Sequence, residues 1–456
     1  MRYPVDPAAL KNAHEWKPLE LLEQGGVDLA NVVGLQTDHA WRQVYAKADD
    51  PVYTDNPCTL GLHWSYDGKI KPSHFIGAVN LSFGVEQHPF VVKPRTLLEN
   101  QAPVDYGAMF ASVLATPSHV TGMELNWLFG CDPDARPIRA VGLPQLTLLE
   151  VTAFLATTAR FVKRHLRQGF VQVRENLTGR ARGRILIADQ IRENLVRARP
   201  DRMVCAYQQF NLDTLENRLL KAALEVCTRW IASNPHYPPQ LQHWVWAIRA
   251  ALASVPEYRP HPSDWSRVRK KGLMATYEQP LAMARLVLTR LHLRPNGQAE
   301  ESERTLPFFL DANRLFEGWV GVCLNKVCNL VQAQEWKTLN IYGHSYNFRP
   351  DFIIKYNEQQ IVVDSKYKPG GPELQDLYQV IGYARLLANP EPIGGDCNQR
   401  IEGLREACLA IPGQPANDAN QALEQFAEAW PERFNKGRCW PDGFQLTLVE
   451  VPLPQT

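Results

Sequence analysis

The chain has 456 residues, of which 45% are hydrophobic and 21% are charged, and its formal net charge is +1. This length predicts two or three domains, and the near-neutral charge leaves any attraction to nucleic acid to local patches. No stretch approaches the roughly 18 uninterrupted apolar residues of a membrane helix, and the N-terminus lacks an apolar signal segment. The nine cysteines include no Cys-x-x-Cys pair, so we expect no structural zinc, no disulfide framework and a cytoplasmic location.

The first region that we predict, residues 1–142, is rich in Pro, Gly and short strand-like runs. The clearest runs are 60–64, 75–83 and 90–92, whose β-branched and aromatic residues favour strands. A helix is expected near residues 106–114. This composition predicts a β-rich domain, and nothing in it has catalytic spacing.

The second region, residues 143–294, is predicted to be mostly helical. Apolar residues recur at helical spacing from 145 to 168, and Gly169 is a plausible stop. A short β-ribbon is expected to pair residues 170–174 with 185–187. Asp213 and Glu216 resemble a capping box, and the helices that should follow span 217–231, 241–252 and 279–293.

Arginines dominate residues 160–202, where twelve basic residues face four acidic ones. Arginine forks suit phosphates and carboxylates alike. The stretch could therefore contact a DNA backbone, dock as a protrusion on an acidic partner, or form a solvated helical face. The docking interpretation gives the partner-binding role to Arg180, Arg182 and Arg184, at the turn of the predicted ribbon.

The third region, residues 305–456, follows a polar linker at 294–304. We predict a helix at 310–331, whose buried stripe includes Phe316, Val320 and Cys323, and a strand at 336–342. A β-hairpin, a helix at 373–387, and strands at 407–411 and 444–451 should follow, with the segment 402–434 partly helical. The resulting order is α-β-β-β-α-β.

The hairpin carries the most informative residues of the chain. The run Arg349-Pro-Asp351 opens its first strand, and Asp364-Ser365-Lys366 closes its second. Asp364 and Lys366 are two positions apart, so in a strand they point to the same side. Because Asp351 lies at the start of the partner strand, pairing should bring it beside them.

Two carboxylates and an ammonium at one spot suit a divalent metal and an activated water. We expect Asp351 and Asp364 to hold Mg²⁺, for which Mn²⁺ could substitute, with the carbonyl of Ser365 as a further ligand. Lys366 could orient the water and stabilise charge on a phosphate. Glu317, from the preceding helix, could complete the metal site directly or through water.

The helix after the hairpin presents Asp376, Gln379 and Tyr383 at i, i+3 and i+7, on one face. Gln379 and Tyr383 could contact a DNA strand beside the site, and Lys368 and Arg349 are further DNA-binding candidates. Each of these residues alone is ordinary for an exposed surface, and Pro-Asp is by itself a turn signal. Their conjunction in this order favours a nuclease site. A P-loop motif is absent from the sequence, so the chain is not expected to bind a nucleotide itself.

The hairpin motif and its element order resemble the PD-(D/E)xK nucleases. Together with Gly183-Arg-Ile-Leu, Ile191-Arg-Glu-Asn-Leu195 and the segment 213–224, they resemble McrC, the nuclease subunit of McrBC-type restriction systems. The resemblance implies a multidomain α+β protein with a C-terminal PD-(D/E)xK α/β nuclease domain. In place of the Asp-Ala-Lys common in the family, this chain has Asp364-Ser365-Lys366.

The resemblance also implies that the chain works with a hexameric AAA+ GTPase of the McrB type. It would stimulate that GTPase through its N-terminal part and cut double-stranded DNA through its C-terminal domain, with the arginine-rich protrusion a candidate for insertion into the partner ring. Two alternatives stay open: a non-catalytic adaptor that activates the partner, and a stand-alone RecB-like nuclease.

Overall fold

The computed structural model describes residues 19–22, 27–28, 63–64, 69–71, 75–83, 86–93, 104–131, 133, 137–139, 144–234, 237–269, 271–293, 299–302, 304–328, 330–334, 337–341, 344–357, 359–368, 371–388, 404–432, 438–439 and 443–455. The chain divides into two compact units. Unit 1 contains Met1–Ala156, His236–Leu241 and Glu301–Thr456, and unit 2 contains Thr157–Pro235 and Gln242–Glu300. Residues from both ends of the chain therefore share unit 1.

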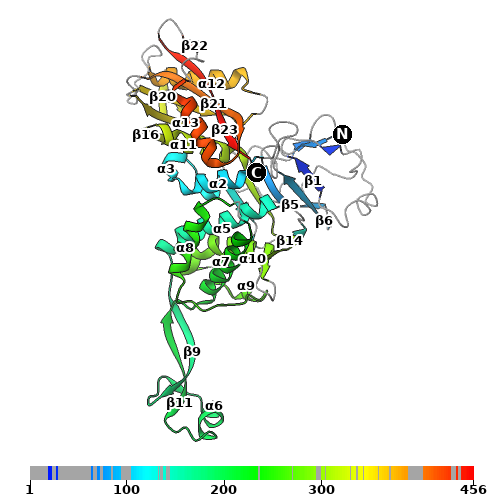
Figure 1. Ribbon diagram of the computed structural model, residues 1–456, viewed down its shortest axis with the longest axis vertical. Coiled ribbons are helices and arrows are strands. Elements are labelled where there is room, and N and C mark those ends of the chain that lie inside the picture. Colours follow the sequence, from blue (N-terminus) through cyan, green and yellow to red (C-terminus); the bar gives the residue numbers. More distant parts are fainter. Residues whose placement is uncertain are drawn as a thin grey trace. The chain divides into compact units, whose positions relative to one another are not determined.

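A six-stranded mixed sheet forms the C-terminal part of unit 1 (Figure 1). Its strands, in spatial order, are β16 Leu330–Ala333, β19 Phe352–Tyr356, β20 Gln359–Ser365, β21 Leu404–Ala416, β23 Gln445–Pro454 and β22 Arg438–Cys439. Strands β19 and β20 are the predicted hairpin and pair antiparallel, whereas β20–β21 and β21–β23 are parallel. A separate two-stranded ribbon pairs β17 Lys337–Ile341 with β18 His344–Phe348.

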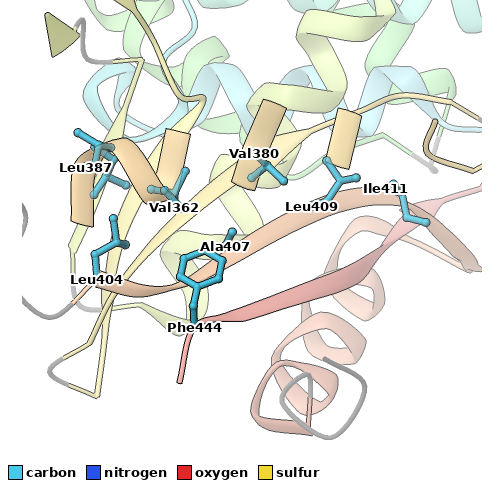
Figure 2. Close-up of a cluster of buried hydrophobic side chains, with 10 residues drawn as sticks. Val362, Val380, Leu387, Leu404, Ala407, Leu409, Ile411 and Phe444 are labelled. Carbon is cyan, nitrogen blue, oxygen red and sulfur yellow. The ribbon is translucent and has the colours of Figure 1, made fainter. Parts of the chain in front are cut away.

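Helix α12, Leu374–Ala388, packs on this sheet through an apolar cluster (Figure 2). Val380, Ala384 and Leu387 of the helix contact Val362 and Leu409 of the strands. The helical positions recur at i, i+4 and i+7, which places them on one stripe. Leu374 at the start of the helix is 62% exposed, whereas Asp376 belongs to the buried stripe.

Helix α11, Ala312–Val327, begins at an Asp311 N-cap whose side chain accepts a hydrogen bond from the Arg314 backbone. Phe316, Val320 and Cys323 are buried, as predicted. The helix ends earlier than the predicted residue 331 because Cys328 is extended. Beyond β21, helix α13 Ala419–Ala429 confirms that the segment 402–434 is partly helical.

The N-terminal part of unit 1 contains a second sheet with the order β1–β6–β5–β15–β7. Its strands are β1 Leu19–Leu22, β6 Glu86–Lys93, β5 Phe75–Phe83, β15 Phe308–Asp311 and β7 Phe129–Cys131. The predicted run 75–83 is therefore a strand. Strand β15 comes from beyond residue 305 and pairs antiparallel with both β5 and β7, so this sheet unites two regions that the sequence analysis separated.

Smaller elements complete unit 1. They are β2 Val27–Asp28, β3 His63–Trp64, β4 Lys69–Lys71, α2 Tyr106–Ala115, α3 Ser118–Thr121, α4 Leu125–Leu128, β8 Ile138–Arg139 and β14 Arg304–Thr305. Helix α2 confirms the predicted helix at 106–114. Of the predicted strand at 60–64, residues 60–62 lie outside the described residues.

Unit 2 is mainly helical. Its helices are α7 Leu215–Ser233, α8 Gln240–Ala251, α9 Asp264–Arg267, the 3-10 helix η5 Gly272–Tyr277 and α10 Glu278–Arg290, and helix α5 Pro144–Arg164 includes the boundary between the units. The N-cap of α7 is Thr214, whose hydroxyl accepts from the Asn217 backbone. The predicted capping box is thus one residue out of place, since Asp213 pairs with Arg218 and Glu216 with Arg269.

The predicted linker at 294–304 is partly a strand. Strand β13, Ala299–Glu301, pairs with β12, Leu291–Leu293. Helix α10 accordingly ends at Arg290 and does not reach the predicted residue 293. None of the described helices is both long enough and apolar enough to span a membrane.

A long β-ribbon extends from the helices of unit 2 (Figure 1). Strand β9, Gly169–Thr178, pairs antiparallel with β11, Arg202–Asn211, over its whole length. The predicted pairing of 170–174 with 185–187 is wrong, because β10, Arg184–Ile185, pairs with β11 and not with β9. The intervening residues form the tip of the ribbon, with α6 Ile187–Gln190 and the π-helical turn η4 Ile191–Leu195.

A buried amide network holds the tip together. The Asn194 amide donates to Asn176 and to Gln190, and Asn176 donates back to Asn194. Gln190 in turn accepts from the Val204 backbone and donates to the Arg202 carbonyl. Because buried amides need partners, this network ties the tip to strands β9 and β11.

Candidate active site

The two aspartates of the hairpin lie at adjacent strand ends. The register pairs Phe352 with Val363, so one step further along the antiparallel pair Asp351 faces Asp364. Asp364 is 1% exposed, and it shares its strand face with Val362, on the side covered by α12. The hairpin pairing thus brings the predicted carboxylates together.

Asp351 is fixed by the residue that follows Asp364. Its Oδ2 accepts hydrogen bonds from the Ser365 backbone N–H at 2.7 Å and from the Ser365 hydroxyl at 2.8 Å. Burial raises the pKa of Asp351 above its ordinary value, and these two donors and the charge of Lys366 oppose the rise. Ser365 therefore orients the carboxylate of Asp351 on the opposite strand.

Asp364 and Lys366 form an ion pair with 2.7 Å between Oδ2 and Nζ. Burial and the charge of Asp351 raise the pKa of Asp364 to about 7, although Lys366 acts in the opposite direction. Burial alone would lower the pKa of Lys366, but the charges of Asp364 and Asp351 raise it above its ordinary value. The lysine is thus held as an ammonium beside two carboxylates.

Glu317 of helix α11 joins the site through Gln334. The Gln334 side-chain amide donates to Glu317 Oε1, and the Gln334 backbone N–H donates to the Asp351 carbonyl at 2.8 Å. Burial, followed by the charge of Asp351, raises the pKa of Glu317 well above its ordinary value, and the charge of Arg349 acts against the rise. Glu317 and Arg349 are therefore electrostatic neighbours of the aspartate pair.

The carboxylates of Asp351 and Asp364 are hard oxygen ligands of the kind that divalent cations prefer. Asp364 Oδ2 is buried, and among the described residues no hydrogen bond of good geometry reaches it, although Lys366 Nζ is close. Within the described part of the chain, no three histidine, cysteine or acidic side chains form a ready ligand set. Mg²⁺ commonly binds through one or two carboxylates plus waters and substrate phosphates, which agrees with an Asp351–Asp364 pair assisted by the Ser365 carbonyl.

Lys368 forms ion pairs with two acidic residues of the protein. Its Nζ lies 2.8 Å from Asp376 Oδ2 and 3.4 Å from Glu373 Oε1. These contacts raise the pKa of Lys368, through the Asp376 hydrogen bond first. Asp376 also accepts from the Glu373 backbone at the start of α12. Any contact of Lys368 with DNA would therefore compete with this ion pair.

Gln379 and Tyr383 lie on one face of α12, as predicted. The Gln379 amide donates to the Tyr383 hydroxyl at 3.0 Å, and the Tyr383 ring stacks on Phe348 with centroids 5.4 Å apart. Gln379 is exposed while Tyr383 is half-buried. Asp376, expected on the same face, is buried, because it is turned toward Lys368.

The three ribbon arginines lie far along the chain from these residues, in unit 2. Arg180, Arg182 and Arg184 are exposed at the turn that follows β9, and the Arg182 guanidinium lies 4.3 Å from the centre of the Tyr207 ring. Gly183 between them has φ 68°, and a Cβ there would lie 2.5 Å from the Ala206 carbonyl oxygen. Only glycine allows this close return of the chain onto β11.

Several apolar side chains are exposed at the same tip. Ile187 is 72% exposed, Leu195 56% and Val196 77%. These exposed apolar side chains were not predicted from the sequence.

Sequence reasoning missed Gln334 and Tyr367. Gln334 has φ 52°, in the left-handed region, and nothing in the run Val331–Trp336 marks a residue that bridges Glu317 and Asp351. Tyr367 follows Lys366 directly, and its hydroxyl contacts the hydroxyl of Tyr106 from α2. The position of Tyr367 directly after Lys366 could have marked it as a site residue. Nothing in the sequence indicated that Tyr106 is its partner.

Comparison with known proteins places the chain among restriction-system proteins. The family model described as McrBC 5-methylcytosine restriction system component matches residues 128–392, more than half of the chain. No curated protein matches the chain.

Solved structures that are similar to the chain include two from Thermococcus gammatolerans. One is a half-complex from the tetradecameric assembly of McrB AAA+ hexamers with bound McrC, with 15% identity, a TM-score of 0.42, and coverage of 96% of this chain and 95% of that chain. The other is the McrBC complex, with 16% identity, a TM-score of 0.29, and coverage of 69% and 89%.

Proposed function

Because this chain belongs to the family of McrBC 5-methylcytosine restriction system components, we propose that it is the DNA-cutting subunit of such a system. The observation that carries the proposal is the pairing of β19 with β20, which sets Asp351 opposite Asp364 with the Lys366 ammonium 2.7 Å from Asp364. Two carboxylates and a cation at one spot are the groups that phosphodiester hydrolysis requires. The C-terminal sheet is proposed to be a PD-(D/E)xK nuclease domain.

The reaction is the attack of a water oxygen on phosphorus, with a new P–O bond formed and the bond to the leaving deoxyribose oxygen broken. The attacking water loses a proton to solvent, and the leaving oxygen takes up a proton from solvent. Lys366 is proposed to donate a hydrogen bond to the attacking water or to a non-bridging phosphate oxygen, where negative charge increases in the transition state. Asp364 holds Lys366 in its charged form. Ser365 orients Asp351 through two hydrogen bonds.

Mg²⁺, or Mn²⁺ in its place, would be held by Asp351, Asp364 and the Ser365 carbonyl, where it would neutralise phosphate charge and lower the pKa of water. The residues suit this role because burial raises the pKa values of Asp364, Asp351 and Glu317, and the charge of Asp351 adds to the rise at Asp364 and Glu317. A bound cation would favour the ionised form of these carboxylates. Glu317 is proposed to support the cation through its link with Gln334. Arg349, Gln379, Tyr383 and Lys368 are proposed to contact the DNA strand.

The ribbon of unit 2 is proposed to bind a hexameric AAA+ GTPase partner. In the Thermococcus complex, McrC is bound to McrB AAA+ hexamers. Of the three interpretations of the arginine-rich stretch, the exposed Ile187, Leu195 and Val196 favour a protein partner, because apolar side chains gain little from a DNA backbone and much from a protein surface. Arg180, Arg182 and Arg184 would add charge complementarity.

The proposal is tested by incubating the chain with its AAA+ partner, GTP, Mg²⁺ and a plasmid containing 5-methylcytosine. Wild-type protein is expected to cut the plasmid, and Asp364→Asn is expected to leave it intact while stimulating the partner's GTPase normally. Equal cutting by both proteins would refute the site. GTPase stimulation without cutting by either would identify a non-catalytic adaptor, and cutting without the partner would identify a stand-alone nuclease.

A further inference from the structure

Two tyrosine hydroxyls meet inside unit 1 beside the candidate site. Tyr106 is the first residue of α2, and Tyr367 directly follows Lys366; their hydroxyls are hydrogen-bonded to each other. Tyr106 is 2% exposed and Tyr367 5%, so neither side chain is available to DNA. The two residues come from parts of the chain that the sequence assigned to separate regions.

Tyr367 directly follows Lys366, just beyond the end of β20, and its ring is buried. Its ring packs on Phe316 of α11, with ring centroids 5.2 Å apart. Lys366 itself continues the pairing with β21 by donating its backbone N–H to the Ala410 carbonyl at 2.9 Å. The Lys368 backbone N–H donates to the Lys366 carbonyl at 3.0 Å, so Tyr367 is the central residue of a tight three-residue turn. Fixing the Tyr367 ring therefore restrains the backbone from which the Lys366 side chain projects.

Tyr106 is itself held in place, because several contacts fix the start of α2. The carboxylate of Asp105 caps α2 by accepting from the Ala108 backbone, and the Asp105 backbone donates to the Pro454 carbonyl at the end of β23. Val104 forms a β-bridge with Gln455, and α2 packs along α11. The start of α2 is thus tied to the same sheet and helix that carry the candidate site.

We propose that Tyr106 is a positioning residue, which holds Lys366 against Asp364 through Tyr367. The inference rests on the proposed nuclease function. A hydroxyl pair suits this role because a hydrogen bond is directional. Apolar packing alone would let the two rings shift relative to each other, whereas the hydrogen bond fixes the position of the Tyr367 hydroxyl. Small displacements of a reacting group can lower a rate by as much as about a hundredfold.

The same segment also contacts the Glu317 side of the site. Gly122, at the C-terminal end of α3, has φ 69°, and a Cβ there would lie 2.9 Å from Gln334 Cγ. Gln334 is the residue that bridges Glu317 and Asp351. Residues 104–123 therefore adjoin the candidate site at two points, which agrees with a positioning role for this helical segment.

The test compares Tyr106→Phe with Tyr277→Phe, in the full chain with its partner. Tyr277, in unit 2, is 0% exposed, and its hydroxyl donates to Asn217 and accepts from the Arg167 backbone. It is a matched control for the loss of a buried, hydrogen-bonded hydroxyl. The measurements are kcat and KM for DNA cleavage, the thermal midpoint, and hydrogen exchange of the peptide that covers residues 361–368.

Tyr106→Phe is expected to lower kcat about ten- to a hundredfold with KM and GTPase stimulation unchanged, and to speed exchange at residues 365–368. Tyr277→Phe is expected to lower the thermal midpoint without changing kcat. Wild-type kcat in Tyr106→Phe, or an equal fall in both variants, would overturn the inference. Failure of the proposed function would show differently, as absence of cutting by the wild-type protein.

Discussion

Asp364 and Lys366 form an ion pair at the end of strand β20, with 2.7 Å between Oδ2 and Nζ, although both side chains are largely removed from water. A buried charge pair lowers the stability of the fold unless its geometry is good and its remaining donors and acceptors are hydrogen-bonded. Here Asp364 also faces a second carboxylate, Asp351. The pair is therefore incomplete, and a cation or a phosphate brought to it would find complementary charge.

Replacement of Lys366 by Met should reduce DNA cleavage about 10²- to 10³-fold, because the transition state loses a fixed donor. GTPase stimulation of the partner should be unchanged, since the ribbon that we propose as its binding surface lies in unit 2. Cleavage assays and GTPase assays on the same preparations measure both. Cleavage within twofold of wild type would remove Lys366 from the mechanism.

Stability in the absence of metal should fall as pH rises. The pKa of Asp364 is about 7 in the folded protein, above its ordinary value of 3.8, so the folded state binds this proton more tightly than the unfolded state. The contribution is complete below the ordinary pKa and is lost as pH passes through about 7. Asp351 and Glu317, whose pKa values are also raised, act with the same sign.

Thermal midpoints measured in EDTA should therefore decrease between about pH 5 and pH 8, and Asp364→Asn should flatten part of this decrease. Added Mg²⁺ should raise the midpoint more at the higher pH, because the ionised carboxylates bind it best. A midpoint shift by Mg²⁺ that is the same at both pH values, or that persists in Asp364→Asn, would argue against a metal site at these residues.

The arginines of the ribbon should govern partner binding and not chemistry. Combined replacement of Arg180, Arg182 and Arg184 by Ala should lower the affinity for the AAA+ partner and the GTPase stimulation at least tenfold, or about 1.4 kcal/mol. The loss should shrink at high salt, where charge attraction is screened. Binding titrations at two salt concentrations measure the effect.

The charge-matched control is the combined Ala replacement of Lys163, Arg164 and Arg167, three exposed basic residues that precede the ribbon. This control removes the same charge but should leave stimulation within about twofold, because surface charges away from the contact act only through the screened long-range field. Equal losses in both triples would mean that net charge, and not the turn of the ribbon, attracts the partner.

Gly183→Ala should loosen the tip of the ribbon more than Gly179→Ala. Both glycines have left-handed backbones, with φ 68° and 67°, so both substitutions carry a conformational cost of about 1 kcal/mol. At Gly183 a Cβ would also lie 2.5 Å from the Ala206 carbonyl oxygen, whereas nothing lies within 4 Å at Gly179. Proteolysis or hydrogen exchange at residues 184–206 measures local opening, and equal effects would contradict this account.

The local parts of the fold could be predicted because their signals lie within a few residues. The hairpin of β19 and β20 followed from two β-branched runs around a polar break, and its register then brought Asp351 to Asp364. Helices α5 and α11 followed from apolar residues at helical spacing, and helices at α2, α7, α8 and α12 were also predicted. Their ends were less certain, as the shift of the N-cap from Asp213 to Thr214 illustrates.

Long-range pairings could not be predicted. Strand β9 has its partner β11 on the far side of the tip, and the nearer candidate at 185–187 has a similar β propensity. Gln334 and Tyr106 reach the site only through the tertiary fold, the first by a left-handed backbone and the second from the first third of the chain. No spacing in a single sequence encodes such contacts.

Strand β15 pairs with β5 across more than two hundred intervening residues, and this has a consequence for biosynthesis. The whole of unit 2 leaves the ribosome between the two halves of that pairing. Domains generally fold as units while the chain emerges. Unit 2 can therefore fold before β15 has been synthesised, while the edge of β5 that pairs with β15 is still unpaired. A chaperone that shields this edge during translation would find it exposed longest in chains stalled before residue 308.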